Sequence, residues 1–273
     1  FGLFPSKFVS TLNDLQDTLK TIRAYRPQIL CIYPSRLIEL MSIIPEHEGS
    51  RLGLRFISLN SETSSFEQRR AMAEFFQCSV LDEYSTEELG WVASECKNGN
   101  YHLWEDMCYT EIVDQDSNRP APPGAMGEIV GTNLHNFTTP FIRYRQGDLG
   151  AIDSQVCRCS SQFRTLHSLV GRKNDAFKFA DQTLSPSFLL DSVYELLLDG
   201  KFPIVDFCMI QEDHSNVRFQ YVARGETMNH LEDMLRDSLR RRFPPGISIQ
   251  IERSHTLEKT VTGKRNPIIS RIR

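Results

Sequence analysis

The first 95 residues alternate between short apolar runs and stretches with a helical period. Apolar residues recur at helical spacing in 11–25, 34–44 and 66–76, and continuous apolar runs occupy 28–32, 55–59 and 78–81. Runs of that length are typical of buried parallel strands, and helical spacing is typical of amphipathic helices. The alternation of strand and helix predicts a parallel α/β sheet.

Two further patterns follow along the chain. Between residues 96 and 170, short strands are expected at 101–105, 109–113, 127–131 and 140–145, the first two as a pair. Short strands with close turns predict an antiparallel barrel or sandwich. From residue 171, strands are expected at 176–179, 205–210, 217–222 and 247–251, with helices after Ser185-Pro186 and over 228–239.

These patterns predict an α/β protein with two domains. A large domain covers 1–170, divided into an α/β part (1–95) and a β-rich part (96–170). A small α+β domain covers 171–273, which is long enough to fold as its own unit.

Composition narrows the class of protein. The 273 residues are 40% hydrophobic and 24% charged, as in ordinary globular proteins. No apolar run approaches the roughly 20 residues that span a bilayer, and a net charge of −4 without a basic stripe does not indicate nucleic-acid binding. Seven cysteines, an odd number, and no signal-peptide pattern at the start predict a cytoplasmic protein with reduced thiols.

Two polar runs follow predicted strands and carry candidate chemistry. They are Tyr84-Ser85-Thr86-Glu87-Glu88 and Arg143-Tyr144-Arg145-Gln146-Gly147-Asp148. Ligands of open α/β sheets bind at the carboxyl ends of strands. Glu88 could hold Mg²⁺ and Asp148 could accept hydrogen bonds from a ribose, although solvated loop carboxylates are the more common case.

Two other polar segments have open interpretations. Gly171–Asp175 joins the two predicted domains and is either a hinge or an ordinary linker. Lys264, in a loop with Thr262 and Gly263, could reach a phosphate or carboxylate as a point charge, although most lysines near a chain end only aid solubility.

A third candidate site is a metal centre. Cys96, His102, Cys157 and Cys159 supply three thiolates and an imidazole, a ligand set that suits structural zinc. The alternative is that Cys96 is a small buried apolar residue and His102 an ordinary strand residue. The motifs of common hydrolases, of Rossmann dinucleotide sites and of Walker-type phosphate loops do not occur.

In this order and spacing, the runs resemble the adenylate-forming superfamily of acyl-CoA ligases and adenylation domains. Its motifs Tyr-Gly-x-Thr/Ser-Glu, Tyr-Arg-Thr-Gly-Asp, Gly-Arg-x-Asp-Asp and Gly-Lys are similar to Tyr84–Glu88, Tyr144–Asp148, Gly171–Asp175 and Gly263-Lys264. Features of the phenylacetate–CoA ligase-like branch are Glu95-Cys96, 101–106, 111–114 and 142–145.

The resemblance implies an AMP-forming acid–thiol ligase that binds ATP, Mg²⁺ and a carboxylic acid, with an aromatic acid as the expected substrate, and that passes the acyl group to coenzyme A or a carrier-protein thiol. For the nucleotide, it implies that Tyr84 stacks near adenine, that Asn60–Thr63 with Glu62 forms the adenine loop, and that Asp148 and Arg172 bind the ribose, with Ser85 and Glu87 in the same nucleotide motif as Tyr84. For the chemistry, it implies that Glu88 binds Mg²⁺ and that Lys264 bridges the acyl carboxylate and the α-phosphate. Asn174 is the implied hinge. The resemblance also implies that Cys96, His102, Cys157 and Cys159 hold structural zinc.

Three positions depart from the family pattern. Ser85 replaces a glycine, Glu87 a hydroxyl residue and Asn174 an aspartate. The family's phosphate loop and the N-terminal subdomain that carries it have no counterpart. We therefore expect a fragment of a longer protein, as the missing initiator methionine also suggests, or a second chain that supplies the remainder. A catalytically impaired scaffold, or an adenylyltransferase without a thiol acceptor, are the alternative functions.

Overall fold

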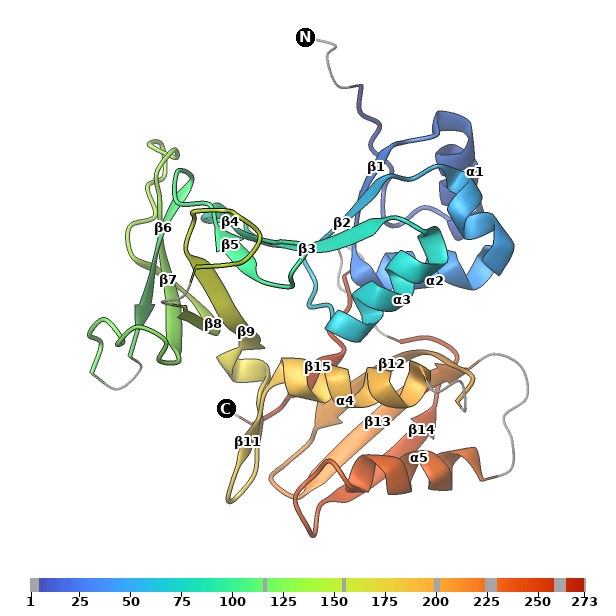
Figure 1. Cartoon of the computed structure of the whole chain (residues 1–273). Helices are drawn as coiled ribbons and strands as arrows, with labels where there is room; N and C mark the ends of the chain where they lie inside the picture. Colours follow the sequence, from blue (N-terminus) through green and yellow to red (C-terminus); the bar gives the residue numbers. More distant parts are fainter. Residues whose placement is uncertain are drawn as a thin grey trace.

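The computed structural model describes residues 5–114, 117–153, 156–198, 202–223, 230–257 and 264–272 (Figure 1). Its first part is the predicted parallel sheet with its helices. The elements are α1 (Leu15–Tyr25), β1 (Ile29–Ile32), α2 (Pro34–Ile43), the 3₁₀ helix η1 (Glu46–Leu52), β2 (Phe56–Asn60), α3 (Phe66–Phe76) and β3 (Ser79–Thr86). Local sequence sets the helix starts: Asp14 caps α1, and Ser65 and Gln68 form a capping box at α3.

The parallel sheet has β1 at its edge. β1, β2 and β3 pair in parallel and in that order. The expectation that 28–32 is a buried strand is wrong, because an edge strand lacks a neighbour on one side and Ile29 is 61% exposed. The core of this part lies between the sheet and its helices, with Leu37, Ile57 and Leu59 fully buried.

Strand β3 continues beyond the parallel sheet and joins it to the β-rich part. Its second half pairs antiparallel with β4 (Gly90–Glu95), so that Tyr84–Thr86 form the carboxyl end of the strand, which extends past its predicted end at Leu81. The result is a single nine-stranded sheet in the order β1-β2-β3-β4-β5-β9-β8-β7-β6. Figure 1 shows β3 running from one part into the other.

The remaining strands of this sheet are antiparallel and enclose a second core. They are β5 (Tyr101–Leu103), β6 (Cys108–Val113), β7 (Gly127–Asn133), β8 (Tyr144–Ile152) and β9 (Thr165–Arg172). The predicted pairing of 101–105 with 109–113 is wrong, because β5 pairs with β4 and β9 whereas β6 pairs with β7. The strand predicted at 140–145 begins only at Tyr144, since Arg143 has a positive φ of 50°, and it continues to Ile152.

The last part is a four-stranded sheet with two helices. A short hairpin, β10 (Phe177–Lys178) and β11 (Thr183–Leu184), precedes α4 (Pro186–Leu198), β12 (Ile204–Gln211), β13 (Asn216–Ala223), α5 (Leu231–Arg240), β14 (Ser248–Arg253) and β15 (Ile268–Ser270). The strand order is β14-β13-β12-β15. Ser185 caps α4 as predicted, because the Phe188 N–H donates to its Oγ at 3.2 Å. Met228, expected in the second helix, lies outside the described residues.

The described residues form three separate hydrophobic cores, the second of which includes Leu89, Val92 and Ala93 from before the predicted division at 95/96. One spans Leu19 to Val80, one Leu89 to Leu166 and one Phe177 to Ile268. The 3₁₀ helix η2 (Lys173–Asp175) follows β9 directly and lies between the last two cores. The domain boundary at 170/171 stays a prediction that agrees with this arrangement. Among the helices described, none combines the length and apolar character needed to cross a membrane.

Candidate functional site

A cleft of about 360 Å³ lies where the three parts meet. The loop after β2, the middle of β3, the ends of β8 and β9, the start of α4 and the segment before β15 form its walls. Six of the predicted nucleotide-site residues line it: Glu62, Tyr84, Ser85, Asp148, Arg172 and Lys264. The structure therefore brings together side chains that are up to 202 positions apart in the sequence, from Glu62 to Lys264.

Glu62 connects two walls of the cleft. Its carboxylate accepts hydrogen bonds from the Ser35 backbone N–H at 3.0 Å and the Ser35 hydroxyl at 2.9 Å, at the first turn of α2. It also accepts one from the backbone N–H of Arg265 at 2.8 Å. A carboxylate at a helix N-terminus is favoured by the helix dipole, so Glu62 is fixed in place.

Tyr84 and Asp148 form a pair inside the cleft. The Tyr84 hydroxyl donates to Asp148 Oδ2 at 2.8 Å, and Arg172 Nε lies 3.8 Å from Oδ1 of the same carboxylate. Register places Asp148 and Arg172 opposite each other on β8 and β9. Burial raises the pKa of Asp148, although Tyr84 and Arg172 oppose that shift, and burial also raises the pKa of Tyr84. The Asp148 carboxylate is therefore a hydrogen-bond acceptor held in a fixed orientation, with the Arg172 guanidinium beside it.

Glu88 lies at the β3–β4 turn, outside the cleft lining. Its carboxylate accepts a hydrogen bond from the Tyr144 hydroxyl at 2.9 Å, and this bond raises the pKa of Tyr144. Glu87 is exposed and also outside the lining, so that its extra negative charge is not inside the cleft.

Lys264 enters the cleft from the segment that leads to β15. Its ammonium lies 5.7 Å from the centroid of the Tyr33 ring, at cation–π distance. Thr262 and Gly263 lie outside the described residues. Asn174, the predicted hinge, is exposed in η2 and does not line the cleft, whereas Arg172 and Asp175 on either side of it do.

One buried acid in the cleft wall, Asp82, is not among the residues predicted from sequence. Asp82 on β3 is buried and accepts a 2.6 Å hydrogen bond from the Tyr101 hydroxyl. Burial raises the pKa of Asp82 to about 7, and Glu95 adds to the shift while Tyr101 and Arg69 oppose it. A charged residue directly after the apolar run 78–81 is the signal that could have revealed it.

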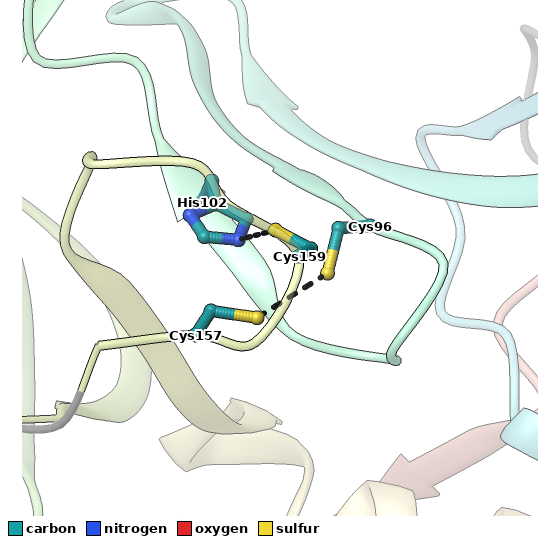
Figure 2. A group of neighbouring side chains, drawn as sticks. All are labelled: Cys96, His102, Cys157 and Cys159. Atoms are coloured by element: carbon teal, nitrogen blue, oxygen red, sulfur yellow. Dashed lines mark hydrogen bonds between the residues drawn. The ribbon is translucent and has the colours of Figure 1, made fainter.

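A second site lies on the β-rich part, at the candidate metal cluster (Figure 2). Cys96 follows β4, His102 is on β5, and Cys157 and Cys159 are in the loop between β8 and β9. Their ligand atoms all lie within 4.8 Å of one another. Cys96 Sγ is 3.8 Å from Cys157 Sγ, and Cys159 Sγ is 3.1 Å from His102 Nε2.

The donor set fits a tetrahedral metal ion. Two thiolates at about 2.3 Å from zinc are about 3.8 Å apart in a tetrahedron, as observed for Cys96 and Cys157. His102 Nδ1 contacts the Phe163 carbonyl oxygen at 3.0 Å; an Nδ1–H donor there leaves Nε2 as the ligand atom. The backbone N–H of Cys159 helps to lower the pKa of Cys157 to about 6, which favours the thiolate that a metal requires.

Comparison with known proteins gives the chain an adenylate-forming acyl-CoA ligase-like fold. It is similar to 2-hydroxyisobutyryl-CoA ligase in the postadenylation state (TM-score 0.78, 18% identity, covering 94% of this chain and 57% of that one). It is also similar to the anthranilate–CoA ligase AuaEII in complex with anthranoyl-AMP (TM-score 0.68, 19% identity, 96% and 52% covered). The fold class predicted from sequence is confirmed.

Curated sequences point in the same direction. The phenylacetate–coenzyme A ligase of Pseudomonas putida is 29% identical over 186 residues, which are 65% of this chain and 41% of the ligase. Protein CapK of Staphylococcus aureus is 19% identical over 264 residues, 95% of this chain and 56% of CapK. No protein-family model matches the sequence. The chain thus spans about half the length of its relatives, or less; the comparisons give no support for a second chain that supplies the rest.

Proposed function

We propose that the protein activates a carboxylic acid with ATP, forming an acyl-adenylate and pyrophosphate, and then transfers the acyl group to the thiol of coenzyme A or of a carrier protein. The observation that carries this proposal is the single cleft that collects Glu62, Tyr84, Asp148, Arg172 and Lys264. The relatives named as coenzyme A ligases, and the similar structures that hold acyl-AMP, support the same reaction class.

The cleft offers complementary groups for an adenylate. Asp148, oriented by Tyr84, accepts the two ribose hydroxyls, with Arg172 beside it. Lys264 places a positive charge between the carboxylate and the α-phosphate, two anions that repel each other until a cation lies between them. Tyr84, Ser85 and the loop around Glu62 form the wall for the base.

Two metal ions belong to the proposal. Glu88, held by Tyr144, is the residue that would ligate Mg²⁺, whose role is to neutralise the ATP phosphates. Cys96, His102, Cys157 and Cys159 would hold zinc, which would tie the β4–β5 turn to the loop before β9. Since that cluster is on the β-rich part and none of its members lines the cleft, we assign it a structural role.

The position of the last part of the fold, from β10 to β15, relative to the rest of the chain supports adenylate formation, the first half of the reaction, as the step to which this conformation belongs. The TM-score to 2-hydroxyisobutyryl-CoA ligase is 0.78 in its postadenylation state, but 0.57 in its open conformation and 0.55 in its thioesterification state. Because the sequence compared is the same, the difference reflects conformation. The conformation described here is accordingly the one in which we expect adenylate formation, with Asn174 as the hinge toward the second half.

Pyrophosphate exchange in the full-length protein tests the proposal. Exchange should depend on added aromatic or short aliphatic acid, and Lys264→Ala should remove most of it, by a factor of about 100 or more. Lys20→Ala, at an exposed lysine of α1, is the matched control and should leave exchange unchanged. Exchange that survives Lys264→Ala would refute the role of Lys264.

Two outcomes would replace the proposal. No heat on titration of ATP and Mg²⁺ into the full-length protein would favour the catalytically impaired scaffold. Mass spectrometry that finds a stable adenylylated product, unchanged by coenzyme A, would favour an adenylyltransferase without a thiol acceptor.

A further inference from the structure

Arg265 is a buried arginine at the junction between the last part of the fold, from β10 to β15 (the small part), and the rest of the chain. Its side chain is 13% exposed, and it directly follows Lys264. The guanidinium forms ion pairs with Glu39 on α2 and with Asp206 on β12. The backbone N–H donates to Glu62 at 2.8 Å. One residue therefore contacts acidic groups on both sides of the junction.

The two carboxylates that Arg265 contacts outside the small part, those of Glu39 and Glu62, are themselves held in place by neighbouring residues. Glu39 pairs with Arg36 on the same helix at 2.8 Å, and Arg36 in turn bonds to the Thr18 hydroxyl at 3.2 Å. Glu62 is fixed by Ser35 at the start of α2. Both anchors are thus connected to α2, Glu39 as one of its residues and Glu62 through its hydrogen bonds to Ser35, and Arg265 connects α2 to the small sheet.

We propose that Arg265 is a positioning residue that holds Lys264 in the cleft. Fixing the backbone and side chain of one residue restricts its immediate neighbour, so the anchors of Arg265 set where the Lys264 ammonium lies. This inference rests on the proposed function for the role of Lys264. The contact geometry around Arg265 does not depend on that function.

When the small part moves relative to the rest of the chain, some contacts of Arg265 are kept and others are lost. The Asp206 pair lies within the small part and moves with it, whereas the contacts to Glu39 and Glu62 must break. Arg265 consequently stabilises the arrangement needed for adenylate formation and does not stabilise an arrangement in which the small part has turned away. Its loss should affect the two half-reactions differently.

The test measures both half-reactions in the full-length protein. Arg265→Ala should lower pyrophosphate exchange about tenfold or more, while thioester formation from preformed acyl-adenylate should stay within about twofold of wild type or rise. Arg265→Lys, which keeps the charge, should recover part of the exchange. Arg271→Ala is the matched control, because Arg271 is 56% exposed and pairs with Glu212 inside the small part.

Removal of a buried arginine leaves carboxylates unpaired and can destabilise the fold, so Glu39→Gln serves as a second variant. Glu39→Gln removes the ion pair between Arg265 and Glu39, together with the Arg36–Glu39 pair within α2, and leaves the Arg265–Asp206 pair in place; pyrophosphate exchange should fall, by less than in Arg265→Ala. Equal losses in both half-reactions, or no loss in Arg265→Ala, would overturn the proposal.

Hydrogen exchange separates this inference from the proposed function. In the wild type, Glu62 accepts from the amides of Ser35 and of residue 265, and Arg265→Ala should speed exchange in the peptides that contain them, whereas Arg271→Ala should not. If the wild type catalyses no pyrophosphate exchange, the proposed function fails while this protection pattern still supports the junction contact. Unchanged protection in Arg265→Ala would overturn the contact itself.

Discussion

At the scale of single residues, two tyrosines and two carboxylates connect the two motifs Tyr84–Glu88 and Tyr144–Asp148 reciprocally. Tyr84 of the first motif donates to Asp148 of the second at 2.8 Å, and Tyr144 of the second donates to Glu88 of the first at 2.9 Å. Hydrogen bonds to ionised carboxylates are shorter and stronger than those between neutral groups. Each motif therefore orients a carboxylate of the other, Asp148 and Glu88, for which we propose roles in binding ribose and Mg²⁺.

Tyr144→Phe tests whether this bond prepares Glu88 for Mg²⁺. Without the hydroxyl, the carboxylate loses one fixed orientation, and the Mg²⁺ concentration for half-maximal pyrophosphate exchange should rise about tenfold, the equivalent of one charge-assisted hydrogen bond. Tyr109→Phe, at an exposed tyrosine of β6, is the control. An unchanged Mg²⁺ dependence would show that Tyr144 does not act through Glu88.

Asp82 gives the molecule a specific pH dependence. Its pKa of about 7 in the fold exceeds the ordinary 3.8, because burial disfavours the charged form, with Tyr101, Arg69 and Glu95 as its titratable neighbours. Between about pH 4 and 7 the unfolded chain gives up this proton while the folded chain keeps it, so this group makes the free energy of unfolding fall as pH rises. We expect Asp82→Asn to reduce that fall.

Thermal melts at pH 5 and pH 8 measure this effect. The wild type should lose more stability than Asp82→Asn between the two pH values. Asp213→Asn is a suitable comparison, since backbone N–H groups lower the pKa of exposed Asp213, and its contribution lies below this pH range. Parallel pH curves for wild type and Asp82→Asn would contradict the assignment.

The sequence identified the residues of the cleft through motifs, but not their partners. Glu62, Tyr84, Asp148 and Lys264 stood out because of polar runs and resemblance to a family. The bonds that orient them join positions far apart, such as Tyr84 with Asp148, 64 residues away, and Arg265 with Glu39, 226 residues away. Spacing along a chain does not specify such contacts, since they depend on how the elements pack.

At the scale of elements, β3 determines the architecture, and here sequence patterns were least informative. The apolar run ended at Leu81, so the prediction stopped there, but the strand continues through Asp82 and Tyr84. Its buried acid is compatible with a strand because Tyr101 on β5 donates to it. Rules based on apolar runs end a strand at a polar residue, and only tertiary partners show that the polar residue is buried.

The cluster around Cys157 should connect two of these elements through a metal ion. We expect one zinc per chain in the purified protein, measured by elemental analysis, and Cys157→Ser should remove most of it. Chelation should lower the melting temperature, because the β4–β5 turn and the loop before β9 lose their link. Cys108→Ser, at a buried cysteine outside the cluster, should retain the metal. Zinc-free wild type, purified without chelators, would refute the site.

At the scale of the whole molecule, the cleft exists only because three separately packed parts meet. Helix α4 of the small part packs on α3 and on β9, and the segment before β15 brings Lys264 and Arg265 to the junction. The described cores stay within their own parts, and at the junction Arg265 forms an ion pair with Glu39 and a hydrogen bond with Glu62. A polar junction between well-packed parts is suited to repeated opening and closing.

The small part should consequently fold without the rest of the chain. Among the described residues, every member of its core lies between Phe177 and Ile268. Expressed alone, residues 171–273 should unfold in one cooperative transition in urea, followed by circular dichroism. Leu235, which is fully buried on α5, provides the control: Leu235→Ala should lower the free energy of unfolding by about 2–5 kcal/mol. A non-cooperative transition would mean that the small part requires the junction for its structure, and that the boundary at 170/171 divides a single folding unit.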